Sequence, residues 1–498
     1  MSLRRGMAAV GLAMALGVIG GVPAGYAADG TAPEQRLKAA AGKAAQKDCV
    51  ASLRLVAALL KDKAFATLPE SRQVDAYQLG AFCALQLRKD ELAYPYAVEA
   101  TRRKGTHPIL WRVRLLTELR ENRNAEAVAT LEAMASVTPG FLNTLSIRWL
   151  YQLSRDVKPN PELRRRLLSV LAAPSYQPEE VGMTSDSFKR DYAALLADSG
   201  DKAGALALAR TIEDPATLVD VSIDPRLRAA LPAEFDGRAE VERSLAKARE
   251  VAASHPGSMT VLLEVSKYLR VLNRPEDALA TLEAARPDGP QGAAFTDLDS
   301  QRNWWWDEMA RTYQMLGRYD DAVAAFRSGI EGKEYGGLNV SQTINLSDTQ
   351  LRFGHPADAL ATIAAFESGK YSISGYGEMQ MRQVRGCAQI ALGQAAAAKA
   401  DLDYAVAHEK DAPDALMALQ LCAGDIDAAA AAMIRRLDDP DLRSQALLVL
   451  SDFDPSPAAF PPEPYERRLH ELKARPDVQA AIARAGGTRR YRLQGSDF

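Results

Sequence analysis

One stretch of the sequence, residues 303–329, constrains the fold more than any other. Its first half carries apolar residues at intervals of three and four, which predicts a helix of about four turns with one buried face. Gly317 interrupts this periodicity, and a second amphipathic pattern begins at Asp320, where acidic residues favour the first turn of a helix. The stretch therefore predicts two antiparallel helices joined by a tight glycine turn.

Small and aromatic side chains recur at fixed positions in this predicted helix pair. These positions are Trp306, Ala310, Tyr313, Gly317, Tyr319, Ala322 and Phe326. The small residues let the helices approach closely, while the rings fill the space around their contact. The pattern resembles the signature of the tetratricopeptide repeat, in which the position of Trp306 is buried in the core. Because one such pair cannot bury its apolar face alone, the resemblance implies that further pairs stack on it.

Weaker copies of the pattern follow one another along most of the chain, each with a glycine or asparagine at its turn. Both residue types tolerate a left-handed backbone. The predicted turn residues are Asn122, Gly200, Asn273, Gly317, Gly354, Gly393 and Gly424. Their spacing scatters around the family's period of about 34 residues. We therefore predict an all-α fold without a sheet, a solenoid of antiparallel helix pairs. A neighbouring type of helical repeat stays open for the weaker pairs.

Stretches rich in proline and glycine divide the predicted solenoid. Residues 286–302 predict a soft boundary between two arrays. Residues 453–464 contain too many prolines for a regular helix and predict a linker. The predicted organisation is a signal peptide at 1–27, an N-terminal helical array with irregular insertions at 28–285, a C-terminal array at 303–452, and capping helices with a tail at 465–498.

The first 27 residues have the features of a cleavable signal peptide. Arg4 and Arg5 precede an apolar run, and Gly25 and Ala27 offer small side chains at the cleavage position. A retained membrane anchor is the alternative, but it needs about 20 apolar residues, and this run is shorter and interrupted by glycine. No later stretch is apolar for long enough to cross a membrane. We therefore expect a periplasmic or secreted bacterial protein.

The charge of the chain argues against nucleic acid as a partner. The formal net charge is −3, and it becomes −5 without residues 1–27, which contain two arginines and no acid. Phosphate binding needs a concentrated basic face instead. Near the C-terminus lies one small basic cluster, interpreted as a solvated tail, with contact to an anionic membrane as the alternative. It consists of Arg484, Arg489, Arg490 and Arg492.

Four cysteines in an exported chain predict disulfides. Antiparallel packing would bring Cys49, at the start of one helix, beside Cys83, near the end of the next. Cys387 and Cys422 fall near the turn ends of the first helices of adjacent pairs. Each predicted bridge closes a loop of about 35 residues and would contribute roughly 3 to 4 kcal/mol in the chain-entropy model. Buried free thiols are the alternative for both pairs.

The sequence contains no recognisable catalytic or cofactor-binding constellation. The five histidines are scattered without the H-E-x-x-H spacing of a metal site, and neither a G-x-S-x-G turn nor a complete phosphate loop occurs. The cysteines lack close ligand spacing and an accompanying histidine. Because the predicted repeats occupy most of the given sequence, we expect no separate catalytic domain within it. We therefore expect no enzymatic activity, no cofactor and no metal.

The resemblance to the tetratricopeptide family implies a concave groove lined by the first helix of each pair. The groove candidates that follow from it are Trp304, Asp307, Arg311, Gln314, Lys267, Arg270 and Asp348. Family members that clamp a terminal carboxylate use Lys and Asn where this chain has Asp307 and Arg311. These two are four residues apart and are expected to pair with each other, which puts the clamp in doubt. One of Trp304 and Trp305 is expected near the groove or at a seam between pairs.

These observations predict a non-catalytic scaffold of the bacterial cell envelope that binds a protein or peptide in its groove. The alternative is an envelope accessory protein for polysaccharide, cell-wall or outer-membrane machinery that binds glycan. An exposed, aromatic and weakly charged groove would favour that alternative.

Overall fold

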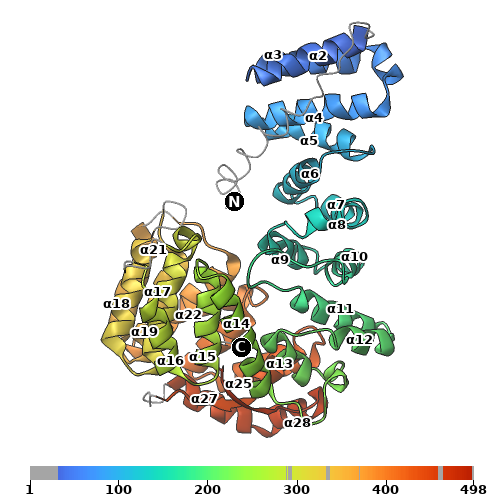
Figure 1. Ribbon diagram of the computed structural model, residues 1–498. Helices are drawn as coiled ribbons and strands as arrows, with labels where there is room; N and C mark the ends of the chain where they lie inside the picture. Colours follow the sequence, from blue (N-terminus) through green and yellow to red (C-terminus); the bar gives the residue numbers. More distant parts are fainter. Residues whose placement is uncertain are drawn as a thin grey trace. The chain divides into compact units, whose positions relative to one another are not determined.

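The computed structural model describes residues 32–287, 289, 294–332, 337–368, 371–457 and 464–495. Helices account for most of them (Figure 1), so the predicted all-α solenoid is confirmed. The chain divides into two compact units, unit 1 at residues 1–192 and unit 2 at residues 193–498. The predicted signal peptide lies outside the described residues. Within the described ranges, no helix combines the length and apolar character that a membrane span requires.

Unit 1 is a stack of antiparallel helix pairs. Its elements are α2 (Ala32–Ala45), α3 (Cys49–Lys61), η2 (Lys63–Thr67), α4 (Glu70–Gln86), α5 (Asp90–Thr101), α6 (Ile109–Arg120), α7 (Asn124–Val137), α8 (Pro139–Leu142), α9 (Ile147–Asp156), α10 (Pro161–Leu171) and the start of α11 (Asp186–Asp198). From α2 to α7 each helix packs against the next one along the chain. Buried alanines such as Ala84, Ala93 and Ala97 line these contacts, and their small side chains permit the close approach.

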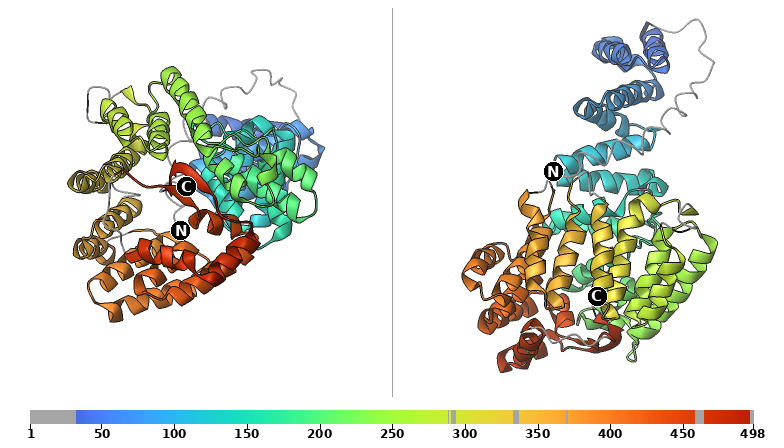
Figure 2. Two further views of the ribbon diagram at one scale, coloured as in Figure 1. Left: turned by 90° about the horizontal axis from the view of Figure 1, so that it is seen from below. Right: turned by 90° about the vertical axis from the view of Figure 1, so that its left-hand side faces the viewer.

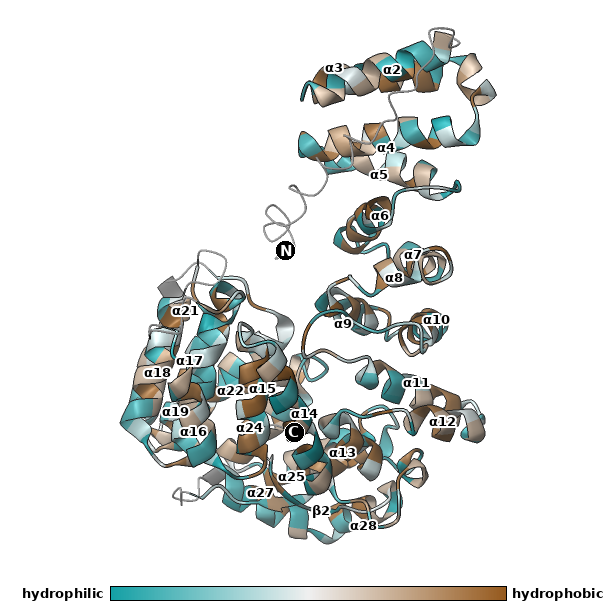
Figure 3. Cartoon of the chain, viewed as in Figure 1, coloured by the Kyte–Doolittle hydropathy of each residue, from teal (hydrophilic) through white to brown (hydrophobic). Residues whose placement is uncertain are grey.

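Unit 2 continues from α11 with a longer series of pairs. Its further elements are α12 (Lys202–Ala209), α13 (Pro215–Ile223), η3 (Arg228–Ala230), α14 (Gly237–Ser254), α15 (Met259–Val271), α16 (Pro275–Ala284), α17 (Leu298–Met315), α18 (Tyr319–Glu331), α19 (Val340–Arg352), α20 (Pro356–Ile363), α21 (Ala365–Ser368), α22 (Gly375–Ala391), α23 (Ala395–Ala407), α24 (Pro413–Ala423), α25 (Ile426–Asp438), α26 (Arg443–Val449), β1 (Asp452–Asp454), α27 (Pro464–Ala474), α28 (Pro476–Ala485) and β2 (Arg490–Gln494). Hydrophobic and hydrophilic residues alternate along these helices (Figure 3), as expected of helices that bury one face.

Five pairs of unit 2 form two layers of helices. The first helices, α15, α17, α19, α22 and α24, pack on one another in this order. Each second helix from α16 to α23 packs against its own first helix and against the first helix of the next pair. Helices on the concave side of a curved array come closest together, so the first helices form the inner layer.

The turns inside the pairs adopt the left-handed backbone that the sequence predicts. All seven predicted turn residues have positive φ values, from 54° at Asn122 to 92° at Gly200. Glycine and asparagine adopt this conformation at low cost. Unit 1 contains two further turns of the same kind, at Lys47 (φ 61°) and Arg88 (φ 55°), where neither glycine nor asparagine marks the position.

The two ends of unit 2 pack against each other (Figure 2). α13 contacts α26, while β2 contacts α14 and α15. β2 pairs in parallel with β1 and carries Tyr491 and Leu493 into a core that includes Val219 and Val241. The hydroxyl groups of Tyr491 and Ser222 lie 2.8 Å apart in this core. The described part of the chain thus contains one short sheet where the sequence predicts none.

Arg489, Arg490 and Arg492 lie at this closure; they are at least partly exposed, as predicted, but they belong to an ordered strand and its start instead of a tail. Arg490 and Arg492 flank the buried Tyr491 on the exposed side of β2, and Arg492 pairs with Asp236 at 2.7 Å. Residues 489–492 line a hollow of about 400 Å³ together with residues 234–237, which include two acids. The arginines therefore face acidic neighbours at the seam between the two ends of unit 2.

Packing is continuous across residues 286–302, where the sequence predicts a soft boundary. α15 and α16, which precede this segment, both pack against α17, which follows it. Met259, Leu282 and Trp305 belong to one hydrophobic cluster. The helices on either side of the segment therefore share a core.

Candidate functional site

The three consecutive tryptophans of α17 lie in three different environments. Trp305 is fully buried, Trp306 is half-buried, and Trp304 is 40% exposed. The indole N–H of Trp305 donates to the carbonyl of Leu282 at 3.2 Å, so this ring fills the seam between two pairs. The sequence predicts that Trp306 is the buried ring, but the fully buried ring is that of Trp305. Trp304 remains available on the surface because adjacent helix residues point in different directions.

Asp307 lies at the centre of a hydrogen-bond network between α17 and α19. Arg311 donates to one carboxylate oxygen at 2.6 Å, which forms the expected pair. The side-chain amides of Gln342 and Asn345 donate to the other oxygen at 3.2 and 2.7 Å. The carboxylate is buried, and a buried charge needs such donors. Asp307 therefore holds two inner helices together and has little surface to offer a partner.

Other groove candidates are also engaged within the chain. Arg270 of α15 is buried and pairs with Glu308 of α17 at 2.9 Å. The amide of Gln314 donates to the hydroxyl of Thr349 on α19. Within α19, Asp348 pairs with Arg352 at 2.7 Å. Most candidate charges of the inner layer are thus balanced by partners on the same or the next inner helix.

Lys267 is exposed on α15 and lies near a half-buried acid, Glu264. Burial raises the pKa of Glu264 above its usual value, although the Tyr268 hydroxyl and the charge of Lys267 act in the opposite direction. The Tyr268 hydroxyl donates to the Glu264 carboxylate at 2.9 Å. This part of the inner layer therefore combines the exposed cation of Lys267 with an acid, Glu264, whose pKa is raised.

Tyr376, at the start of α22, is a candidate that sequence reasoning missed. Its side chain is 61% exposed. Partial desolvation raises the pKa of its hydroxyl, the charge of Asp414 on α24 raises it further, and that of Arg311 on α17 lowers it. Tyr376 thus lies near helices on both sides of its own. It precedes the apolar pattern of α22 and falls outside the repeat signature, so no periodic signal marked it.

The C-terminal helices reach the same region. Burial raises the pKa of Tyr465 on α27, and charges of Arg352, Asp414 and Arg436 also act on its hydroxyl. Asp414 and Arg436 pair at 2.6 Å. The inner surface, as we use the term, consists of Lys267, Trp304, Arg311, Arg352 and Tyr376. Its two arginines are held by Asp307 and Asp348, so exposed rings stand among largely balanced charges.

One of the two predicted cysteine pairs is bridged. Cys387 of α22 and Cys422 of α24 form a disulfide with their Cα atoms 5.3 Å apart, which links two inner helices. Cys49 and Cys83 are buried free thiols in one cluster with Ala44. Burial and a hydrogen bond to Cys83 raise the pKa of Cys49 to about 12. The predicted bridge between them is therefore absent from the structure, and such a site disfavours the thiolate that disulfide formation requires.

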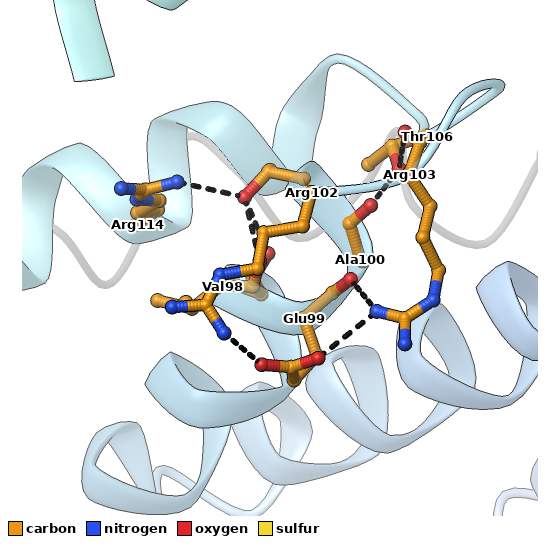
Figure 4. A network of polar contacts seen from close by, with 9 residues as sticks. Val98, Glu99, Ala100, Arg102, Arg103, Thr106 and Arg114 are labelled. Atoms are coloured by element: carbon orange, nitrogen blue, oxygen red, sulfur yellow. Dashed lines mark hydrogen bonds and ion pairs between the residues drawn. The ribbon is translucent and has the colours of Figure 1, made fainter. Parts of the chain in front are cut away.

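Unit 1 contains an arginine-rich junction after α5, but its charges are occupied (Figure 4). Arg102 and Arg103 both contact the carboxylate of Glu99, and Arg103 also donates to the Glu99 carbonyl. Arg114 donates to the hydroxyl of Thr101 at 3.2 Å. These contacts fasten the end of α5 to α6 and hold Arg102 and Arg103 on one carboxylate. No cluster of metal-binding side chains occurs among the residues that the structure describes.

Comparison with known proteins finds no matching family model and no similar curated protein. Similar solved structures include the human IFIT1 dimer with m7Gppp-AAAA, at 13% identity and a TM-score of 0.34 over 90% of this chain and 87% of that one. The APC/C hetero-tetramer Cut9–Hcn1 has 14% sequence identity and a TM-score of 0.28 over 91% of this chain and 90% of that one. The TPR domain of P58(IPK) has 13% sequence identity and a TM-score of 0.21 over 79% of this chain and 99% of that one. These superpositions are poor, so the fold assignment rests on the helix pairs described above.

Proposed function

We propose that this protein is a non-catalytic scaffold that binds a protein partner on the inner surface of unit 2. One observation carries the proposal: Trp304 and Tyr376 are exposed rings on a layer whose charges are largely paired with one another. Aromatic side chains bury a large area with few rotatable bonds, and they are enriched among the residues that dominate binding energy at protein interfaces.

The proposed place of action is the cell envelope, after export. The basic and apolar N-terminal sequence supports export. The disulfide between Cys387 and Cys422 suits an oxidising compartment. It also fastens α22 to α24, which keeps part of the inner layer in one geometry before a partner arrives.

The test is affinity capture from envelope extract of the source cells, with the mature chain as bait. A Trp304→Ala, Tyr376→Ala variant removes both exposed rings. A Val137→Ala, Val181→Ala variant is the matched control, because it also truncates two exposed hydrophobic residues but lies in unit 1. The captured protein is then purified and titrated against all three chains. We expect the first variant to weaken binding by at least about tenfold and the control to bind like the wild type. Equal binding by all three chains would contradict the proposed surface.

Glycan binding is the second candidate, since exposed rings also stack on sugars. It is favoured by the same two residues and by the balanced charges around them. Calorimetric titration with soluble peptidoglycan fragments distinguishes the candidates. Heat that is lost with the Trp304→Ala, Tyr376→Ala variant would favour the envelope accessory role.

A further inference from the structure

The first two turns of unit 1 hold cations in a backbone conformation that disfavours them. Lys47 and Arg88 both have positive φ, at a steric cost that glycine would avoid. Both side chains are exposed, as are those of Lys43 and Lys89 beside them. Among the described residues, none of these four cations has an acidic partner within ion-pair distance. Strain that persists at equivalent positions of two consecutive pairs points to a use for these cations.

Both turns lie on the same edge of unit 1. Consecutive helices run antiparallel, so the turn within every pair points to the same end of the stack. Cys49 at the start of α3 and Cys83 near the end of α4 share one buried cluster, which brings the two turns side by side. Val50 and Leu92, each just beyond a turn, are 47% and 46% exposed. The turn edge, as defined here, consists of Lys43, Lys47, Val50, Arg88, Lys89 and Leu92.

The other unit of the chain has the opposite charge. Residues 32–192 contain 25 Lys and Arg and 18 Asp and Glu, a formal net charge of +7, whereas residues 193–498 contain 34 and 45, a net charge of −11. Part of this negative charge is concentrated in residues 395–441, which contain ten Asp and Glu and four Lys and Arg. One of these acids, Asp401, is buried and paired with Arg382 and Arg385. Unit 2 therefore offers an anionic surface that complements the turn edge.

The acidic region also displays exposed aliphatic side chains. Val406 of α23 is 56% exposed, and Leu392 lies exposed just before α23. Asp403, Asp427 and Asp438 have largely exposed carboxylates, and within the part of the chain that the structure describes they pair with exposed or half-exposed bases. Such surface pairs contribute little and exchange readily. The acidic face, as we use the term, consists of these five residues, and it is opposite in charge to the turn edge and, like it, includes two exposed aliphatic side chains.

We propose that the turn edge of unit 1 docks on the acidic face of unit 2 in a second copy of this chain. The complementary charges orient the two copies, and the exposed aliphatic side chains add apolar area to the contact. Each docked copy still presents one free turn edge and one free acidic face. Such a head-to-tail contact builds larger assemblies as the protein concentration rises.

Sedimentation velocity of the mature full-length chain tests this contact. At about 20 mM salt the average mass should rise with protein concentration, and at about 500 mM salt the chain should be monomeric, because salt screens the charges. A Lys47→Glu, Arg88→Glu, Lys89→Glu variant should weaken self-association by about tenfold or more. The matched control is Lys61→Glu, Lys63→Glu, Arg165→Glu, which changes the net charge equally at exposed sites off the edge and should associate like the wild type. Circular dichroism checks that each variant is folded.

A complementation experiment assigns both sides of the contact. Asp403→Lys, Asp427→Lys, Asp438→Lys should abolish self-association alone and restore it when mixed with the reversed turn edge. A wild type that stays monomeric at low salt would overturn the proposal, as would a control that weakens association as much as the edge variant. Cosedimentation of the monomer with phosphatidylglycerol vesicles, lost in the edge variant, would assign the edge to an anionic lipid and likewise overturn docking to a second copy.

Discussion

The two units build the same helix pair but make its turn differently. In unit 2 the turns between α17 and α25 all use glycine, at Gly317, Gly354, Gly393 and Gly424. In unit 1 the corresponding turns use Lys47, Arg88 and Asn122. All of these turn residues have positive φ, so the helix pair depends on a left-handed turn. It does not depend on which residue type occupies that turn, and the side chain there can serve another purpose. In unit 1 that choice places cations on the surface.

The units also differ in what holds them together. The structure closes unit 2 by contacts between residues far apart in sequence, including Ser222 and Tyr491, and braces it with a disulfide. The helix pairs of unit 1 pack on their neighbours along the chain, and its two cysteines are free. In a stack of that kind stability is close to a sum of local terms, whereas closure makes the first and last elements of unit 2 depend on each other.

Loss of the disulfide should give the largest difference between the units. Cys387→Ala, Cys422→Ala opens a loop of 35 residues and should cost roughly 3 to 4 kcal/mol in the chain-entropy model. Hydrogen exchange of the full chain should show lost protection in α22 to α24 and unchanged protection in α2 to α7. Cys49→Ala, Cys83→Ala removes two unbridged thiols and is the control. Equal losses in both variants would mean that Cys49 and Cys83 also form a bridge, and a titration that finds fewer than two free thiols in the unfolded, unreduced chain would say the same.

Truncation of the closing strand comes next. Leu493 of β2 is fully buried and shares a hydrophobic cluster with α14. Leu493→Ala should therefore lower the free energy of unfolding by about 3 kcal/mol. Because β2 joins the two ends of unit 2, hydrogen exchange should accelerate in α13 and α14 as well as near the C-terminus. Arg492→Ala changes an exposed neighbour on the same strand and should have little effect. Faster exchange confined to residues 489–495 would show that the closure adds no cooperativity.

The glycine turns of unit 2 and the cationic turns of unit 1 can be compared directly by exchanging their residue types. A Cβ at Gly354 or Gly393 would meet no other atom, so alanine there isolates the backbone cost, about 1 to 2 kcal/mol for each site. The reverse changes, Lys47→Gly and Arg88→Gly, should raise the free energy of unfolding of unit 1 by less than about 1 kcal/mol, because glycine also gains freedom in the unfolded chain. Urea unfolding with exchange readout in both units measures all four. Destabilisation by both glycine substitutions would show that the cations stabilise their turns.

How much the sequence predicts depends on whether the signal is local. The helix pairs and seven of their turns follow from periodicity and from glycine or asparagine at the break, since both are properties of a short window. The turns at Lys47 and Arg88 were not predicted, because neither residue type indicates a left-handed backbone. The β1–β2 pair escaped because it joins residues 452–454 to 490–494, and no pattern in either short segment indicates the other.

The inner surface was only partly predictable for a related reason. The family register correctly places Asp307 and Arg270 on first helices, but it cannot show that Gln342, Asn345 and Glu308 satisfy them from the neighbouring helix. Tyr376 lies before the repeat register begins. Whether a polar side chain is free or engaged is decided by the packing between pairs, which a pattern within one pair does not contain.

The smallest expected effect compares two acids that lie on first helices of the two units. Glu118 is buried in unit 1 but has Arg114 as a partner at 2.9 Å and a hydrogen bond from Thr130 at 2.7 Å. Glu264 in unit 2 accepts from Tyr268, and burial raises its pKa above the usual value near 4.3. Between its unfolded and folded pKa values the native state holds more protons than the unfolded state. Stability contributed by this group therefore falls as pH rises through that window and stays lower above it.

Glu264→Gln keeps an acceptor for Tyr268 and removes this charge. The variant should be more stable than the wild type at pH 7, by less than about 1 kcal/mol, because it removes a charge that burial disfavours, and the gain should shrink as pH falls and the wild-type carboxyl takes up its proton. Glu118→Gln should instead lose stability at pH 7, because it leaves Arg114 without its charged partner. Urea unfolding with hydrogen-exchange readout at the two pH values measures both. A gain of equal size at pH 4 and pH 7 would mean that packing of the amide, and not the charge of Glu264, sets the difference between the two acids.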